Sequence, residues 1–78
     1  MPDAIFILKG IKPGVKGLSV LVIEKCFGLW EYKMNKTEME KWGSSLEEIQ
    51  RMNKTGDLGC VVFERVSDKI LKLKEIRG

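Results

Sequence analysis

The apolar residues of this chain change their period once, and that change most constrains its fold. Residues 4–34 and 58–76 carry short apolar runs typical of β-strands, whereas residues 37–52 repeat their apolar positions every three or four residues. A chain of 78 residues holds a single core. The pattern therefore predicts one α+β domain, residues 1–78, in the order β-β-(β)-α-β-β, with four to five antiparallel strands and one helix.

The N-terminal half is predicted to form two or three strands. A β-branched and aromatic run at residues 4–9 favours a first strand, and residues 12–14 a turn with proline at its second position. Residues 18–26 alternate and are apolar on both faces in the middle, which predicts a central strand. Residues 29–34 form either a third strand or a bulged continuation of the second.

The helical segment has two candidate starts. Thr37 with Glu40 and Ser45 with Glu48 both match a capping box, and Gly43 lies between them. One kinked helix or a helix-turn-helix both satisfy this pattern. The helix is expected to end near Asn53, before a turn at residues 55–57.

The C-terminal third is predicted to be a hairpin. Residues 58–66 alternate as a strand, in which Gly59 marks a bulge or a close approach of two backbones. Ser67 and Asp68 are the candidate two-residue turn, and residues 70–76 return as a strand.

The composition argues against catalysis. The chain has no histidine to activate a serine or cysteine, and no glycine-rich phosphate loop. Two cysteines without histidine do not complete a four-ligand zinc site within one chain. We therefore expect no enzyme, metal or cofactor, and we expect Cys26 and Cys60 to be reduced core thiols, with a single disulfide as the alternative.

The apolar runs are far shorter than the roughly 20 residues that cross a bilayer, and the first residues do not have the composition of a secretory signal. A cytoplasmic protein with no membrane contact is expected. The formal net charge is +3, and its distribution is uneven. Residues 1–36 and the tail from residue 58 are basic, whereas residues 37–57 are acidic, which suits a polyanionic partner.

Aromatic and basic residues together predict a single-stranded nucleic-acid surface, because bases stack on rings and phosphates bind cations. Trp30 and Tyr32 are the candidate stacking residues, on one face of a strand. The candidate phosphate contacts are Lys9, Lys12, Lys16, Lys33, Lys72 and Lys74. Two alternatives stay open: the rings face the core, and the lysines of the last strand protect a sheet edge from aggregation.

Two stretches resemble simple single-stranded-DNA-binding proteins of the OB-fold class related to replication protein A. Lys9, Ile11-Lys12-Pro13-Gly14, Lys16 and Leu18, then an apolar strand ending at Glu24, are similar to the opening of that family. Lys54-Thr55-Gly56 and the run through Val62 and Phe63 are similar to its Thr-Gly turn and third strand. The resemblance implies that Phe63 stacks on a base, and that the alternative fold is a distorted OB-like barrel.

The alternative function is a protein-interaction module or small regulatory protein that uses helix 37–52 or a sheet edge. The apolar helical stripe would then bind a protein partner or a second copy of the chain, since such a stripe fits a groove. Its members are Met39, Trp42, Leu46, Ile49 and Met52. The competing interpretation is that this stripe packs on its own sheet.

Overall fold

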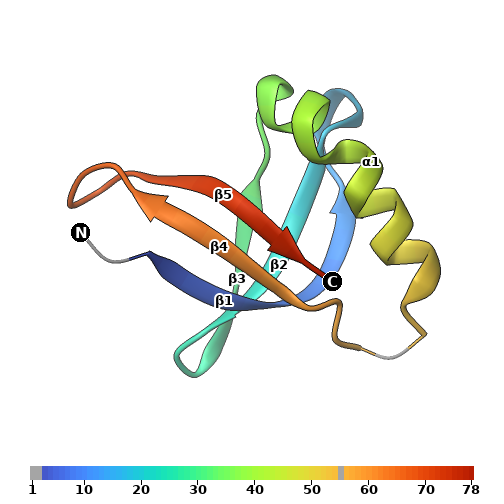
Figure 1. The fold of residues 1–78 in the computed structure, drawn as a ribbon, viewed down its shortest axis with the longest axis horizontal. Coiled ribbons are helices and arrows are strands. Elements are labelled where there is room, and N and C mark those ends of the chain that lie inside the picture. Colours follow the sequence, from blue (N-terminus) through green and yellow to red (C-terminus); the bar gives the residue numbers. More distant parts are fainter. Residues whose placement is uncertain (1–2, 55) are drawn as a thin grey trace.

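Five antiparallel strands and one helix form the protein in a computed structural model, which describes residues 3–54 and 56–78 (Figure 1). The elements are β1 (Ala4–Pro13), β2 (Ser19–Lys25), β3 (Gly28–Lys33), α1 (Lys36–Met52), β4 (Cys60–Arg65) and β5 (Leu71–Arg77), with a 3₁₀ turn at Val15–Gly17. The predicted α+β class and strand order are confirmed. The segment after Phe27 is a separate third strand.

The strand order in the sheet is β3-β2-β1-β4-β5. The first four strands therefore form a Greek key, in which β4 returns to lie beside β1. The strands β3 and β5 share no ladder, so they are the two edges of an open sheet in the described part of the chain. Strand pairing thus does not close the OB-like barrel that was the alternative fold.

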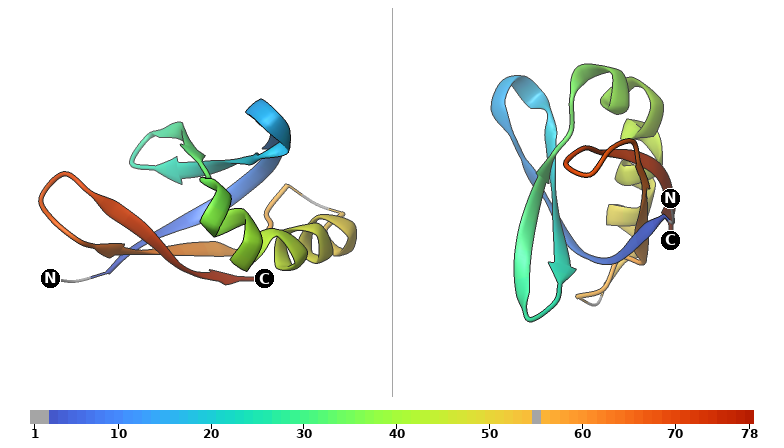
Figure 2. Two further views of the ribbon diagram at one scale, coloured as in Figure 1. Left: turned by 90° about the horizontal axis from the view of Figure 1, so that it is seen from above. Right: turned by 90° about the vertical axis from the view of Figure 1, so that its left-hand side faces the viewer.

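The first strand bends because its register shifts between Leu8 and Gly10. Residues 4–7 of β1 pair with β4, and residues 7–13 pair with β2. The β2–β3 hairpin consequently diverges from the β4–β5 hairpin, as the views in Figure 2 show. The helix α1 lies at the end of the sheet away from the β4–β5 loop (Figure 1).

The core lies between α1 and one face of the sheet, which we call the inner face. Leu8, Leu21 and Phe63 point to this face and are fully buried there. Leu46 of α1 packs against them, so the helix covers one end of the inner face. Side chains of alternate parity point to the outer face, where Glu24 and Lys33 are exposed, whereas Val20 and Val62 are buried.

The helix is continuous and starts earlier than predicted. Asn35 is its N-cap: its side-chain oxygen accepts from the Glu38 N–H at 2.8 Å, and Glu38 accepts from the Asn35 N–H at 3.1 Å. This reciprocal pair satisfies two amide groups at the helix start. Both predicted capping boxes are therefore wrong, and Gly43 lies inside an unbroken helix, which rules out the two-helix alternative. The predicted end is confirmed, with Asn53 as the C-cap.

Three turns differ from the sequence expectation. The β1 strand continues through Lys12 to Pro13, so the predicted turn begins later, at Gly14. Cys26 and Phe27 connect β2 to β3, which leaves Cys26 exposed with a positive φ of 56° rather than buried in the core. The β4–β5 connection spans residues 66–70 and is wider than a two-residue turn.

The two cysteines are both free, and Cys60 is half-buried in β4. Gly59 is a close backbone approach, as predicted: a Cβ there would lie 1.9 Å from the Arg77 carbonyl oxygen. Of the predicted turn at residues 55–57, Thr55 lies outside the described residues. In the described part of the chain, no helix has the length and apolar character needed to span a membrane.

Candidate nucleic-acid interface

The aromatic residues expected to stack on bases do not share one environment. Trp30 and Tyr32 lie opposite Ile23 and Leu21 in the β2–β3 ladder, so both rings point to the inner face. Trp30 lies beyond the core and is 56% exposed, whereas Tyr32 is half-buried. Phe63 is 1% exposed beneath them. The role in base stacking that the resemblance implied for Phe63 is therefore wrong, because no base can reach its ring.

Tyr32 joins β3 to both the helix and the last strand. Its ring packs edge-on against Phe63, with centroids 4.8 Å apart. Its hydroxyl donates a hydrogen bond to Glu38 Oε2 at 2.5 Å, and the backbone of Leu73 interacts with the same hydroxyl. Burial, followed by the hydrogen bond and charge of Glu38, raises the pKa of Tyr32. Tyr32 is thus a structural residue with one partly exposed flank.

Most of the predicted phosphate-binding lysines do not lie beside the rings. Lys33 alternates with Trp30 and Tyr32 on β3, and therefore points to the outer face. Lys72 lies opposite the exposed Glu64 in the β4–β5 ladder, again on the outer face. Lys16 lies in the 3₁₀ turn after β1. None of these three forms an ion pair with another described residue.

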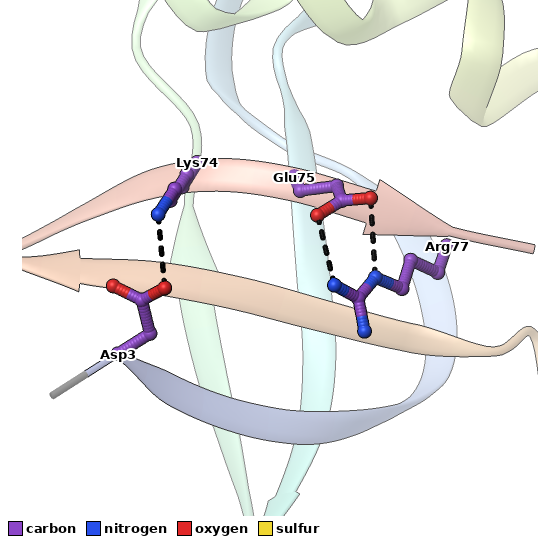
Figure 3. Close-up of polar contacts among 4 residues, drawn as sticks. All are labelled: Asp3, Lys74, Glu75 and Arg77. Carbon is purple, nitrogen blue, oxygen red and sulfur yellow. Dashed lines mark hydrogen bonds and ion pairs between the residues drawn. The ribbon is translucent and has the colours of Figure 1, made fainter.

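The other three predicted lysines form ion pairs with acidic residues of the chain. Lys9 pairs with Asp57, Lys12 pairs with Glu31, and Lys74 pairs with Asp3. Figure 3 shows the Lys74 ammonium reaching across β4 to the Asp3 carboxylate, at 2.9 Å. On the same strand, Arg77 pairs with Glu75. These contacts neutralise much of the positive charge that the sequence places on the sheet.

The ion pairs shift several pKa values in the expected directions. The hydrogen bond to Asp57 raises the pKa of Lys9, and that to Asp3 raises the pKa of Lys74. The hydrogen bond from Lys12 lowers the pKa of Glu31. All these groups are solvent-exposed, so the pairs are surface contacts of small energetic weight.

A different group of side chains, which we call the aromatic cleft, combines rings and cations on the inner face. Its members are Phe6, Lys25, Trp30 and Arg65. The Lys25 ammonium lies 4.9 Å from the Trp30 ring centroid and 5.9 Å from that of Phe6. Phe6, Lys25 and Arg65 line one shallow cavity of about 700 Å³, which also reaches the outer-face residues Ile5 and Ile7; Trp30 lies outside its lining. Neither cation forms an ion pair among the described residues.

The bend in β1 creates this cleft. The β1–β2 ladder begins at Ile7 and Glu24, so residues 4–6 of β1 have no partner on the β2 side. The end of β2, with Lys25, therefore stands apart from Phe6 and leaves open space between the two hairpins. Asp3 and Glu24 also line this space, but Asp3 is bound to Lys74 and Glu24 points to the outer face.

Sequence reasoning missed Phe6, Lys25 and Arg65 as site residues, although the strand alternation contains part of the signal. Lys25 has the same parity as Leu21 and Ile23, and Arg65 the same parity as Val61 and Phe63. A charged residue that follows two buried residues on the same face of a strand lies where that face leaves the core and becomes exposed to solvent. That Lys25 lies over both Phe6 and Trp30, and shares a cavity with Arg65, depends on the bend at Lys9, which local sequence does not encode.

The apolar helical stripe is mostly used inside the protein. Leu46 is buried, and Met39, Trp42 and Ile49 pack against the core. Only Met52 of the five is strongly exposed, at 73%. The competing interpretation, in which the stripe packs on its own sheet, accounts for most of its members.

Within residues 3–54 and 56–78, no three cysteine, aspartate or glutamate side chains cluster closely enough to bind a metal ion. No family model, curated protein or solved structure matches the chain. The function must therefore be argued from the aromatic cleft itself.

Proposed function

We propose that this protein is a non-catalytic module that binds single-stranded nucleic acid through the aromatic cleft. The observation that carries the proposal is the position of Trp30: its ring is exposed on the inner face, beside the Lys25 ammonium, which forms no ion pair in the described chain. An exposed ring for a base and nearby cations for phosphates are the two requirements of such a site.

The energetic scale favours a site of this kind. Stacking of one base on an aromatic side chain contributes about 1–3 kcal/mol, and it tolerates every base because each has a π-face. In the OB-fold, a five-stranded, partly open Greek-key barrel, the face of strands 2 and 3 binds oligonucleotides, and this sheet has the same Greek-key order in its first four strands although strand pairing does not close it. Lys25 and Trp30 lie at the end of those two strands.

The predicted lysines have a secondary part in this proposal. Lys16, Lys33 and Lys72 form no ion pair in the described chain, but Lys33 and Lys72 point to the outer face, away from the cleft. Lys9, Lys12 and Lys74 must first leave their carboxylate partners, so we expect them to contribute less.

Tryptophan fluorescence tests the proposal directly. The chain has two tryptophans, so the Trp42→Phe variant leaves Trp30 as the only one. Titration with a mixed-sequence single-stranded oligonucleotide should give saturable quenching at about 50 mM salt that weakens at about 200 mM. The Trp30→Phe variant is the matched control, and should bind a labelled oligonucleotide more weakly. No fluorescence change at either salt concentration would overturn the proposal.

A protein-binding role at a sheet edge is the second candidate function. One observation favours it: Ile5, Ile7 and Leu29 are exposed apolar residues on the outer face, and Leu29 belongs to the edge strand β3. An open edge strand can pair with an extended segment of another protein. This role predicts that Leu29→Lys abolishes partner binding, whereas Trp30→Phe leaves it intact.

A further inference from the structure

The Lys25 ammonium occupies the space that a stacked base would need. It lies 4.9 Å from the Trp30 centroid and 5.9 Å from the Phe6 centroid, so the two rings are at most about 11 Å apart. Aromatic groups stack with centroids about 4.5–7 Å apart. One planar base placed where the ammonium lies would therefore be within stacking range of both rings.

The contacts that hold Lys25 there are weak enough to be exchanged. Lys25 is half-buried and forms no ion pair among the described residues, so its ammonium is bound only by the two rings. A cation over an exposed ring is a modest attraction. A base has a larger contact area with the ring than an ammonium has, and stacking is the stronger interaction.

We propose that a single unpaired nucleobase displaces the Lys25 ammonium, inserts between Trp30 and Phe6, and leaves Lys25 and Arg65 to bind the phosphates on either side. This inference rests on the proposed function and adds to it a slot for one base, which the Lys25 ammonium fills in the free protein. Bases in a duplex are stacked and paired, so the slot selects single strands. Arg65 lines the same cavity as Lys25, on the opposite hairpin.

The chain contains a matched control for this exchange. The Lys41 ammonium lies 5.0 Å from the Trp42 centroid, almost the same distance as in the Lys25–Trp30 pair. Trp42, however, lies on α1 and packs against the core, and among the described residues the Lys41 ammonium lies over this one ring, whereas the Lys25 ammonium lies over two. A base should therefore displace Lys25 and leave Lys41 in place.

Nuclear magnetic resonance of the wild-type protein reports this exchange without any mutation. Ring currents should shift the side-chain methylene protons of Lys25 and Lys41 upfield in the free protein. Saturating single-stranded oligonucleotide should abolish the Lys25 shift and leave the Lys41 shift unchanged. A Lys25 shift that persists at saturation would overturn the displacement, while the binding itself would still support the proposed function.

Salt dependence tests whether Lys25 binds a phosphate once a base has displaced its ammonium. For single strands, each phosphate contact adds about 0.7 to the slope of log affinity against log salt. Between about 50 and 200 mM salt, Lys25→Met should therefore lose about 2–3-fold less affinity than the wild type, and Lys41→Met should match the wild type. Equal slopes for all three proteins would overturn the phosphate role of Lys25. Absence of wild-type binding at both salt concentrations would overturn the proposed function, and this inference with it.

Discussion

The Tyr32 hydroxyl donates a hydrogen bond to the Glu38 carboxylate at 2.5 Å, and so joins the edge strand β3 to the first turn of α1. Glu38 is only 8% exposed, and its other oxygen accepts from the Asn35 N–H. One carboxylate thus completes the helix cap and positions the strand that carries Trp30. In the described chain the edge strand β3 shares no ladder with β5, and this side-chain hydrogen bond ties it to α1 instead.

Removal of the Tyr32 hydroxyl should destabilise the protein. The Tyr32→Phe variant leaves Glu38 Oε2 buried without its donor, which costs about 1–3 kcal/mol. Urea unfolding followed by circular dichroism measures this change. Trp30→Phe, on the same face of the same strand, is the control and should change the free energy of unfolding by less than about 0.5 kcal/mol. Equal effects of the two variants would contradict the assigned role of the hydroxyl.

Alkaline pH should weaken the fold through the same residue. The folded state raises the pKa of Tyr32 above its usual value of about 10. Below about pH 10 the Tyr32 hydroxyl keeps its proton in both the folded and the unfolded state, so its contribution to the free energy of unfolding is fully present. As pH rises further, the unfolded chain loses the proton first, and the free energy of unfolding must fall.

Tyr32 is the only tyrosine of the chain, so phenolate absorbance near 295 nm reports its titration alone. We expect the absorbance to rise at higher pH in the folded protein than in urea. The free energy of unfolding should also fall more steeply above pH 10 in the wild type than in Tyr32→Phe. Lys9 and Lys74, whose pKa values are also raised, affect both proteins equally and cancel in this comparison. Coincident titration curves in folded and unfolded protein would contradict the prediction.

Core packing at Phe63 should dominate stability. Phe63 is fully buried and contacts the rings of Phe6 and Tyr32, so Phe63→Ala should cost about 3–5 kcal/mol. For a domain of 78 residues this is a large part of the total stability. Phe27→Ala, at the exposed β2–β3 turn, is the control and should be nearly neutral. Chemical denaturation compares the two, and a small effect at Phe63 would restore it as a candidate surface residue.

Gly59 should not accept a side chain. Its φ is +109°, and a Cβ would lie 1.9 Å from the Arg77 carbonyl oxygen, so Gly59→Ala must move β5 away from β4. Backbone strain alone costs about 1–3 kcal/mol at such a position. Gly28→Ala is the control, because a Cβ there meets no atom within 4 Å. Thermal unfolding should show a marked loss for the first variant and little change for the second.

The pattern of apolar residues predicts the fold well, because period two and period 3.6 are direct consequences of strand and helix geometry. The helix start was missed because Asn35 with Glu38 matches the same signature as Thr37 with Glu40, and in the fold Glu38 also contacts Tyr32, which the local pattern does not show. Phe63 was misplaced because its strand is apolar on both faces, and the alternation alone does not show which of these side chains joins the core cluster with Leu46 of α1. The cleft itself needs the bend of β1, a tertiary feature.

Arginine 65 and Lys74 should respond differently to substitution, because they lie on opposite faces of the sheet. Arg65 has the parity of the buried Phe63 and lines the aromatic cleft, whereas Lys74 reaches across β4 to Asp3 on the outer face (Figure 3). If single strands bind in the cleft, Arg65→Met should lower oligonucleotide affinity at low salt and reduce the salt slope by about 0.7. Lys74→Met should change both quantities less.

Fluorescence anisotropy of a labelled oligonucleotide at several salt concentrations measures both quantities for the two variants. Each substitution removes one positive charge, so the long-range attraction of the protein for a polyanion falls equally. Any difference in affinity or salt slope between the two variants therefore reflects where the substituted side chain lies on the sheet, and not the change in net charge. A larger effect at Lys74 than at Arg65 would move the binding surface to the outer face, where Lys33 and Lys72 also lie, and would contradict the cleft.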